Sequence, residues 1–114
     1  MIHFRTCEPE GYPEILVVEL TAQLDAGTPE AFFERLEQEI SQGHNRLIFD
    51  CHNLSLITSL GFGVMIRAHS RLQKAGGAVR FARLEGMIEE AFHVVGFHRL
   101  FDNYPTVEAA AASF

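Results

Sequence analysis

The sequence predicts an α/β fold in which a single layer of mixed, mostly parallel β-sheet packs against helices. Short apolar runs at 15–20, 47–49 and 79–82 have the length of buried strands. Amphipathic segments with helix start and stop signals lie between and after these runs. Strands that alternate with helices typically form a parallel sheet. We therefore expect the element order β-β-α-β-α-β-α-α.

Length and composition limit the class of protein. The chain has 114 residues, 47% of them hydrophobic, which suits one globular domain over residues 1–114. A net charge of -6 disfavours nucleic acid or an anionic membrane as the main partner. There is no apolar run near the ~20 residues that span a bilayer, and no signal peptide is visible. The expected location is cytoplasmic, with Cys7 and Cys51 as reduced, buried thiols.

The first part of the chain predicts a hairpin and a helix. Segments 2–6 and 15–20 are the expected strands, joined by a turn at 8–13, and 21–25 is an expected loop. Thr28 suits the N-cap of a helix and Gly43 its end. The predicted apolar side of this helix comprises Ala31, Phe32, Leu36 and Ile40. The predicted water-facing side comprises Glu34, Arg35, Glu37, Gln38 and Glu39.

The segment 46–72 predicts a central strand, a turn and a second helix. The apolar run 47–49 is the strand, and the polar residues Asp50, His52 and Asn53 are expected to end it. Thr58 or Ser59 then caps a helix, because a hydroxyl oxygen accepts from the free N–H groups of the first turn. Residues at helical spacing form its apolar stripe: Leu60, Val64, Ala68 and Leu72.

The last third of the chain predicts a strand and two helices. Gly76-Gly77 ends the second helix, and the strand at 79–82 follows. A helix is expected at 87–95, and the apolar segment 97–101 is a connector or a last short strand. Thr106 is the expected cap of a final helix.

The start of the second helix is the candidate functional site. A phosphate on Ser59 or Thr58 would be tolerated there, because the helix dipole and free N–H groups favour negative charge. The alternative is that both hydroxyls are only helix caps. A partner-binding surface is predicted beside them, consisting of Asp25, Leu60, Gly61, Phe62, Gly63 and Ile66. Asp50 is a further candidate for its rim, with loop solvation and capping as the alternative for both aspartates. For Phe62 and Ile66 the alternative is a helix that is buried on two sides.

Glycines inside the second helix, Gly61 and Gly63, each cost roughly 1 kcal/mol against alanine. They predict close backbone approach by a neighbouring loop or by a partner.

Other chemistry has little support in the sequence. The six histidines form no HxH or HExxH pair, and no CxxC, GxGxxG or P-loop is present. We therefore expect no metal, no cofactor and no enzymatic activity.

Five segments in this order and spacing resemble the STAS domain, the fold of anti-sigma factor antagonists. They are Leu24-Asp25 before a capped helix, the strand 47–50, the segment 57–64, Gly76-Gly77 before a strand, and the segment 95–101. The resemblance implies binding of an anti-sigma factor that is also a serine kinase of the histidine-kinase-like ATPase class. In that family the kinase phosphorylates the serine before the glycine, and a PP2C-type phosphatase reverses it.

The sequence departs from the family pattern at the acceptor. Leu60 occupies the usual acceptor position and has no hydroxyl, and Thr58 replaces the usual aspartate. Ser59 is therefore the first phosphoacceptor candidate and Thr58 the second. The leading hypothesis is a bacterial anti-sigma factor antagonist in a partner-switching pathway that regulates transcription. The alternative is a non-phosphorylated STAS subunit of a transporter, of the lipid transport type, or of a sensory complex.

Overall fold

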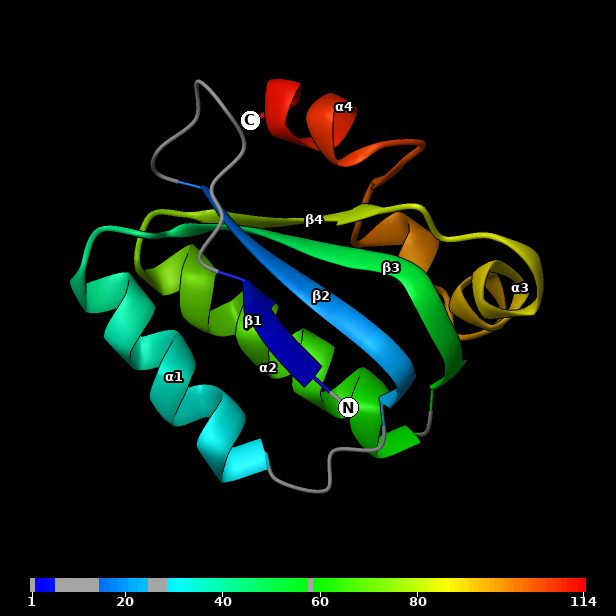
Figure 1. Ribbon diagram of the computed structural model, residues 1–114, viewed down its shortest axis with the longest axis horizontal. Helices are drawn as coiled ribbons and strands as arrows, with labels where there is room; N and C mark the ends of the chain where they lie inside the picture. The colour runs from blue at the N-terminus through cyan, green and yellow to red at the C-terminus, as the bar shows by residue number, and fades with distance from the viewer. Residues whose placement is uncertain (1, 6–14, 25–28, 58) are drawn as a thin grey trace.

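The computed structural model describes residues 2–5, 15–24, 29–57 and 59–114, which form one sheet flanked by helices (Figure 1). The elements, in chain order, are β1 (Ile2–Arg5), β2 (Ile15–Leu24), α1 (Pro29–Ser41), β3 (Arg46–Ile57), α2 (Ser59–Lys74), β4 (Ala78–Ala82), α3 (Gly86–Val94), the 3-10 helix η1 (Phe97–Arg99), β5 (Asn103–Tyr104) and α4 (Val107–Ala112).

The sheet is mixed and mostly parallel, which confirms the predicted fold class. Its strand order is β1-β2-β3-β4-β5. Strand β1 runs antiparallel to β2, and the other three pairings are parallel. Leu47 in β3 pairs with Leu16 in β2 and with Val79 in β4. Apolar residues from three adjacent strands therefore align in one row, as expected of strands buried on both faces.

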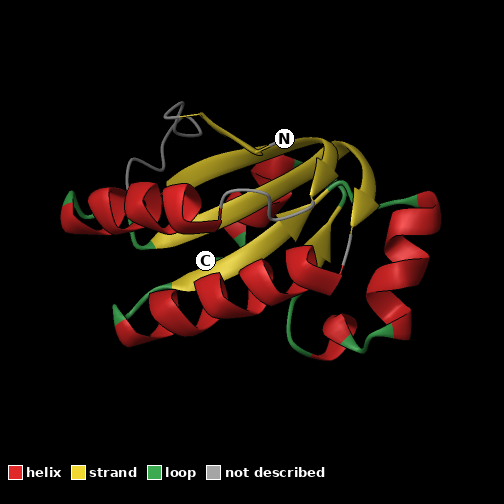
Figure 2. Ribbon diagram, turned by 90° about the horizontal axis from the view of Figure 1, so that it is seen from below, coloured by secondary structure: helices red, strands yellow, loops and turns green. Residues whose placement is uncertain are grey.

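Helices cover both faces of this sheet, as the two ribbon views show (Figures 1 and 2). Helices α1, α2 and α3 lie on one face, over a core that includes Leu36, Met65, Phe81 and Phe92. Helix α4 lies on the other face, where its two buried alanines, residues 110–111, pack near Ile15 and Ile48. The Thr106 hydroxyl oxygen accepts from the Ala109 N–H at 3.0 Å, which confirms the predicted cap of α4.

Strands β2 and β3 are longer than the sequence predicted. The expected loop at 21–25 is strand as far as Leu24, and the expected break at Asp50, His52 and Asn53 does not occur. The two strands stay paired from Ile15 with Arg46 to Leu24 with Ile57, with two register shifts along the way. Because the backbone N–H and C=O groups find hydrogen-bond partners in the neighbouring strand, the strands continue even where their side chains are polar.

Asp50 is fully buried, so its predicted place on an exposed rim is wrong. Its carboxylate accepts from Arg83 Nε at 2.9 Å and also from Arg83 Nη2. Arg83 follows β4 directly, with a positive φ of 61°, and its own N–H donates to the Tyr104 carbonyl at 2.8 Å. A bidentate arginine supplies the charge and donors that a buried carboxylate needs inside a strand.

The segment after α3 resolves an alternative that the sequence left open. Residues 97–101 are a connector that contains η1, and the last strand, β5, comes afterwards at Asn103–Tyr104. Phe97 and Phe101 are both buried, with ring centroids 5.4 Å apart. Their burial under the sheet fixes the connector, and β5 then pairs with the end of β4.

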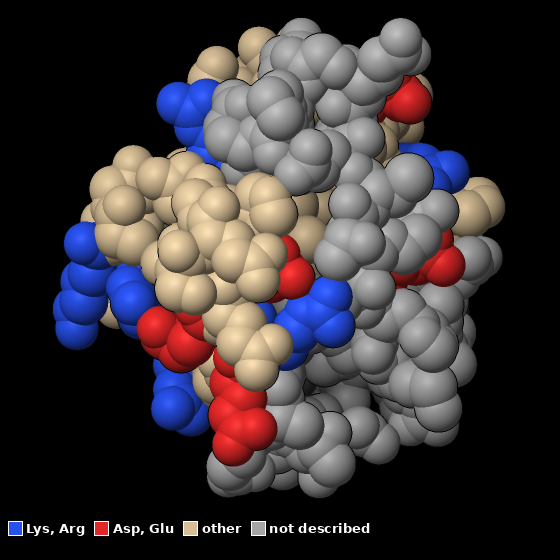
Figure 3. Space-filling model, turned by 60° about the vertical axis from the view of Figure 1, so that its left-hand side comes forward, with Lys and Arg blue, Asp and Glu red and all other residues tan. Residues whose placement is uncertain are grey.

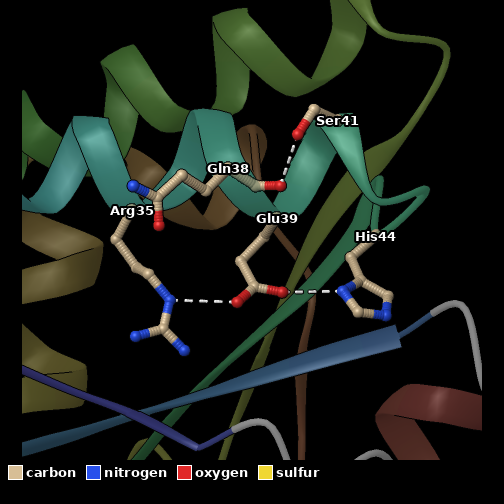
Figure 4. Close-up of polar contacts among 5 residues, drawn as sticks. All are labelled: Arg35, Gln38, Glu39, Ser41 and His44. Atoms are coloured by element: carbon tan, nitrogen blue, oxygen red, sulfur yellow. Dashed lines mark hydrogen bonds and ion pairs between the residues drawn. The ribbon is translucent and has the colours of Figure 1, made fainter.

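Glu39 is buried, although the sequence placed it on the water-facing side of α1. Figure 4 shows Arg35 and His44 converging on its carboxylate from opposite sides. The Arg35 Nε donates to Oε1 at 3.0 Å, and His44 Nδ1 lies 2.7 Å from Oε2. The backbone N–H of His44 also donates to the backbone carbonyl of Glu39 at 2.9 Å, at the end of the helix. Burial raises the pKa of the Glu39 carboxyl, but these two partners outweigh it and lower the pKa below its usual 4.5.

This cluster predicts a defined loss of stability in acid. Because the folded-state pKa of Glu39 is lowered, its contribution is present above about pH 4.5 and is lost as the pH falls through the folded-state value. The Glu39→Ala variant should lose about 1.5–3 kcal/mol of unfolding free energy at neutral pH, the usual contribution of hydrogen bonds to a charged group, and lose less on acidification than the wild type. Urea unfolding between pH 3 and 7 measures both quantities. Equal acid sensitivity of variant and wild type would contradict the assignment.

Candidate functional site

The candidate site begins where β2 and β3 end together. Leu24 and Ile57 are the last residues of the two strands and are register partners, so both strands stop at the same edge of the sheet. Helix α2 begins immediately afterwards at Ser59. Ser59 is the first helical residue. Asp25 and Thr58, both predicted site residues, lie outside the described residues.

The start of α2 has no negative side chain of its own. Its first turn contains no acidic residue, whereas Arg71 and Lys74 lie in its last turn. Basic residues at the C-terminal end interact favourably with the helix dipole. At the positive N-terminal end, the first turn supplies no carboxylate that would do the same. This end can therefore accept an added anion without repulsion from its own first turn.

The next turn of α2 presents part of the predicted binding surface to solvent. Gly63 is exposed, and a Cβ atom built on it would meet no atom within 4 Å. Within the described part of the chain, close approach by a neighbouring loop therefore does not explain this glycine, and approach by a partner stays a prediction. Ile66 is 45% exposed, as predicted, while Met65 beside it is fully buried. Leu60, Gly61 and Phe62 lie in α2, but the placement of their side chains is outside the description.

A groove of about 570 Å³ lies between α1 and α2. The guanidinium of Arg67 lies over the Phe33 ring, 4.0 Å from its centroid. Arg71 forms a bidentate ion pair with Glu37 across the groove, which lowers the pKa of that carboxyl mainly through the hydrogen bond. Phe33 and Arg67 are not among the site residues that the sequence predicts. The signal that could have pointed to Phe33 is its position next to the predicted apolar side of α1.

Charges of both signs alternate over the face that Figure 3 shows, with Lys and Arg side chains between Asp and Glu. The described residues on this face form no continuous basic stripe of the kind that binds nucleic acid. The exposed ion pair between Arg71 and Glu37 contributes little to stability, because water and salt screen it.

The described residues give little support to a catalytic or metal centre of the usual kind. They contain no group of three or more His, Cys, Asp or Glu side chains that could hold a metal ion. Cys51 is buried, as predicted, and burial raises the pKa of its thiol far above the usual range, so it is a poor nucleophile. In the same part of the chain, helices fall short of the length and apolar content needed to cross a bilayer.

A mixed five-stranded sheet, with three helices on one face and a helix that begins at the edge where two strands end, defines a small α/β domain. The family model of the STAS domain matches residues 6–110. The chain belongs to the STAS domain family, which confirms the resemblance seen in the sequence.

Known proteins agree with this assignment. The chain is 26% identical over 100 residues to a protein named as an anti-sigma factor antagonist, BtrV of Bordetella bronchiseptica, covering 88% of this chain and 86% of BtrV. It superposes on the unphosphorylated anti-sigma factor antagonist SpoIIAA with a TM-score of 0.76 and 21% identity, covering 96% and 92% of the two chains. The fold is that of the anti-sigma factor antagonists.

A transporter shares this fold as one part of a larger chain. The murine anion transporter Slc26a9 superposes with a TM-score of 0.71 and 15% identity, over 89% of this chain and 18% of the transporter. At that identity the likeness extends to the fold alone.

Proposed function

We propose that this protein is an anti-sigma factor antagonist that binds a kinase-type anti-sigma factor through the start of α2. The observation that carries the proposal is the open face of that helix, where Gly63 and Ile66 are exposed beside a first turn without acidic residues. An exposed apolar side chain beside a glycine lets a partner backbone approach closely. In this proposal the protein acts by binding and catalyses no reaction.

Phosphorylation of Ser59, or else of Thr58, would switch this binding off. A phosphate adds about -1.5 to -2 charges and three acceptor oxygens. The start of the helix tolerates that charge, because its free N–H groups and dipole favour an anion. A docked partner would have to desolvate the same group. SpoIIAA, which shares the fold, has been solved in a phosphorylated form that superposes with a TM-score of 0.71 and 20% identity, over 99% of this chain and 98% of SpoIIAA.

The test uses purified kinase-type anti-sigma factors of the histidine-kinase-like ATPase class from the source genome. Each is incubated with the protein and ATP, and intact mass spectrometry follows the addition of phosphate. We expect one phosphate, removed by a PP2C-type phosphatase, and its loss in Ser59→Ala or in the Thr58→Ala, Ser59→Ala double variant. Ser70→Ala is the matched control, because Ser70 is an exposed serine farther along α2. Phosphate that survives in the double variant would remove the switch.

Gly63 provides a prediction in which stability and binding change in opposite directions. The Gly63→Ala variant should gain about 0.5–1 kcal/mol of unfolding free energy, because the site is open and alanine favours helix. If a partner backbone approaches here, the same methyl group should weaken binding to the anti-sigma factor at least roughly tenfold, or about 1.4 kcal/mol. Thermal unfolding and calorimetric titration measure the two effects. A stabilised variant with unchanged affinity would place the partner elsewhere.

The second candidate is a constitutive STAS subunit of a transporter or of a sensory complex. Leu60 at the usual acceptor position favours it, and so does the fold shared with Slc26a9. This role predicts co-purification with a transporter or sensory subunit that Ser59→Asp does not disturb. In the leading proposal, by contrast, Ser59→Asp weakens the complex.

A further inference from the structure

Two histidines meet on the surface at the end of α3, away from the start of α2. His93 lies in the last turn of α3, and His98 lies in η1. Both are exposed, and their rings stack with centroids 4.4 Å apart and an interplanar angle of 23°. The pair is five residues apart in sequence and spans a helix end, so a search for HxH or HExxH spacing does not detect it.

The buried residues before them hold the two histidines together. Phe92 precedes His93, Phe97 precedes His98, and both phenylalanines are buried with ring centroids 5.5 Å apart. The turn between them is closed by the Gly96 N–H, which donates to the His93 carbonyl at 3.0 Å. Gly96 has a φ of 80°, a conformation that glycine adopts without strain. The core therefore fixes the backbone of both histidines before any ligand binds.

We propose that His93 and His98 form a surface site for a borderline divalent transition metal such as Zn²⁺. Neutral imidazole nitrogens are preferred ligands of zinc, copper and nickel. Rings stacked at 4.4 Å bring two such donors close together, and exposed side chains can rotate to point both nitrogens at one ion. Among the described residues there is no group of three or more such ligands, so the ion keeps coordination positions open to water or to a donor from another molecule.

The site is tested by titrating the full chain with Zn²⁺ in a calorimeter, while NMR follows the histidine ring signals. All samples carry His3→Gln, which removes a histidine close to the amino end that could bind metal independently. We expect one saturable Zn²⁺ per chain, with perturbed ring signals from His93 and His98. Loss of a group that only hydrogen-bonds to a metal ligand already costs about tenfold to a hundredfold in metal affinity. Each of His93→Gln and His98→Gln removes a ligand itself, so each should cost at least tenfold.

His52→Gln is the matched control, because His52 is an exposed histidine on β3, distant in sequence from the pair. It should leave zinc affinity unchanged. His52, His93 and His98 are exposed, so substituting them should leave thermal unfolding at the temperature of the His3→Gln parent. Absence of saturable binding by the parent chain would overturn the proposal. So would binding that persists unchanged in the His93→Gln, His98→Gln double variant.

Discussion

Replacement of Gly77 by alanine is expected to destabilise the protein more than any other single methyl group added to a described glycine. A Cβ atom at residue 77 would lie 1.6 Å from the Asn45 carbonyl oxygen and 2.6 Å from its carbon. Both atoms belong to the backbone that leads into β3, so a change of side-chain rotamer cannot relieve the clash. The Gly77 N–H also donates to the Leu72 carbonyl at 2.8 Å, and the Ala78 N–H donates to Asn45 at 3.2 Å. The clash must therefore separate the end of α2 from the start of β3 and β4.

We expect Gly77→Ala to lose more than about 3 kcal/mol of unfolding free energy, above the usual cost of an overpacked methyl group. Urea unfolding followed by circular dichroism measures this loss. Gly63→Ala is the matched control, since the same substitution meets open space there and should stabilise. If Gly77→Ala unfolds at the wild-type urea concentration, the close approach of these two segments is wrong.

The second large effect is expected at Arg83, the partner of the buried Asp50. Its guanidinium binds both oxygens of that carboxylate, and this hydrogen bond raises the pKa of Arg83 further above its usual value. Glu19 and Glu108 contribute to the same negative surroundings. Arg83→Met keeps much of the side-chain length but removes the charge, so a fully buried carboxylate loses its bidentate partner. We expect a loss of about 3 kcal/mol of unfolding free energy.

Two further variants separate the ion pair from backbone strain. Arg83 has a φ of 61°, which glycine adopts more easily than arginine. Arg83→Gly should still destabilise the protein, because the stabilisation lost with the ion pair exceeds the backbone strain that glycine relieves. The Asp50→Asn, Arg83→Met double variant should recover part of the loss, which a double-mutant cycle measures as coupling. A stabilised Arg83→Gly variant, or zero coupling, would contradict the importance of this pair.

The local signals in the sequence predicted most of the fold. Helix starts and stops depend on nearby backbone groups, so the sequence suffices to find them. Examples are Thr106 as the cap of α4, Gly43 near the end of α1 and Gly76-Gly77 after α2. Strand β3 was predicted too short because an aspartate, here Asp50, usually ends an apolar strand. Its partner, Arg83, is 33 residues away, and local patterns carry no information about that pairing.

The same reason explains the other differences. Glu39 was assigned to solvent by helical periodicity, but Arg35 and His44 make its burial possible. Of the predicted binding surface, Gly63 and Ile66 are exposed, and the roles of Ser59 and Thr58 stay predictions. The histidine pair at 93 and 98 depends on a turn between two elements, which residue spacing alone does not reveal.

The proposed docking surface is tested most directly by amide hydrogen exchange, with and without the purified kinase-type anti-sigma factor. The first N–H groups of α2 have no acceptor within the helix, so they exchange readily until something covers them. Binding should slow exchange in a peptide covering residues 59–66, and Ser59→Asp should abolish this protection while Ser70→Asp leaves it intact. Protection confined to α3 or α4, with exchange at 59–66 unchanged, would contradict binding at the start of α2.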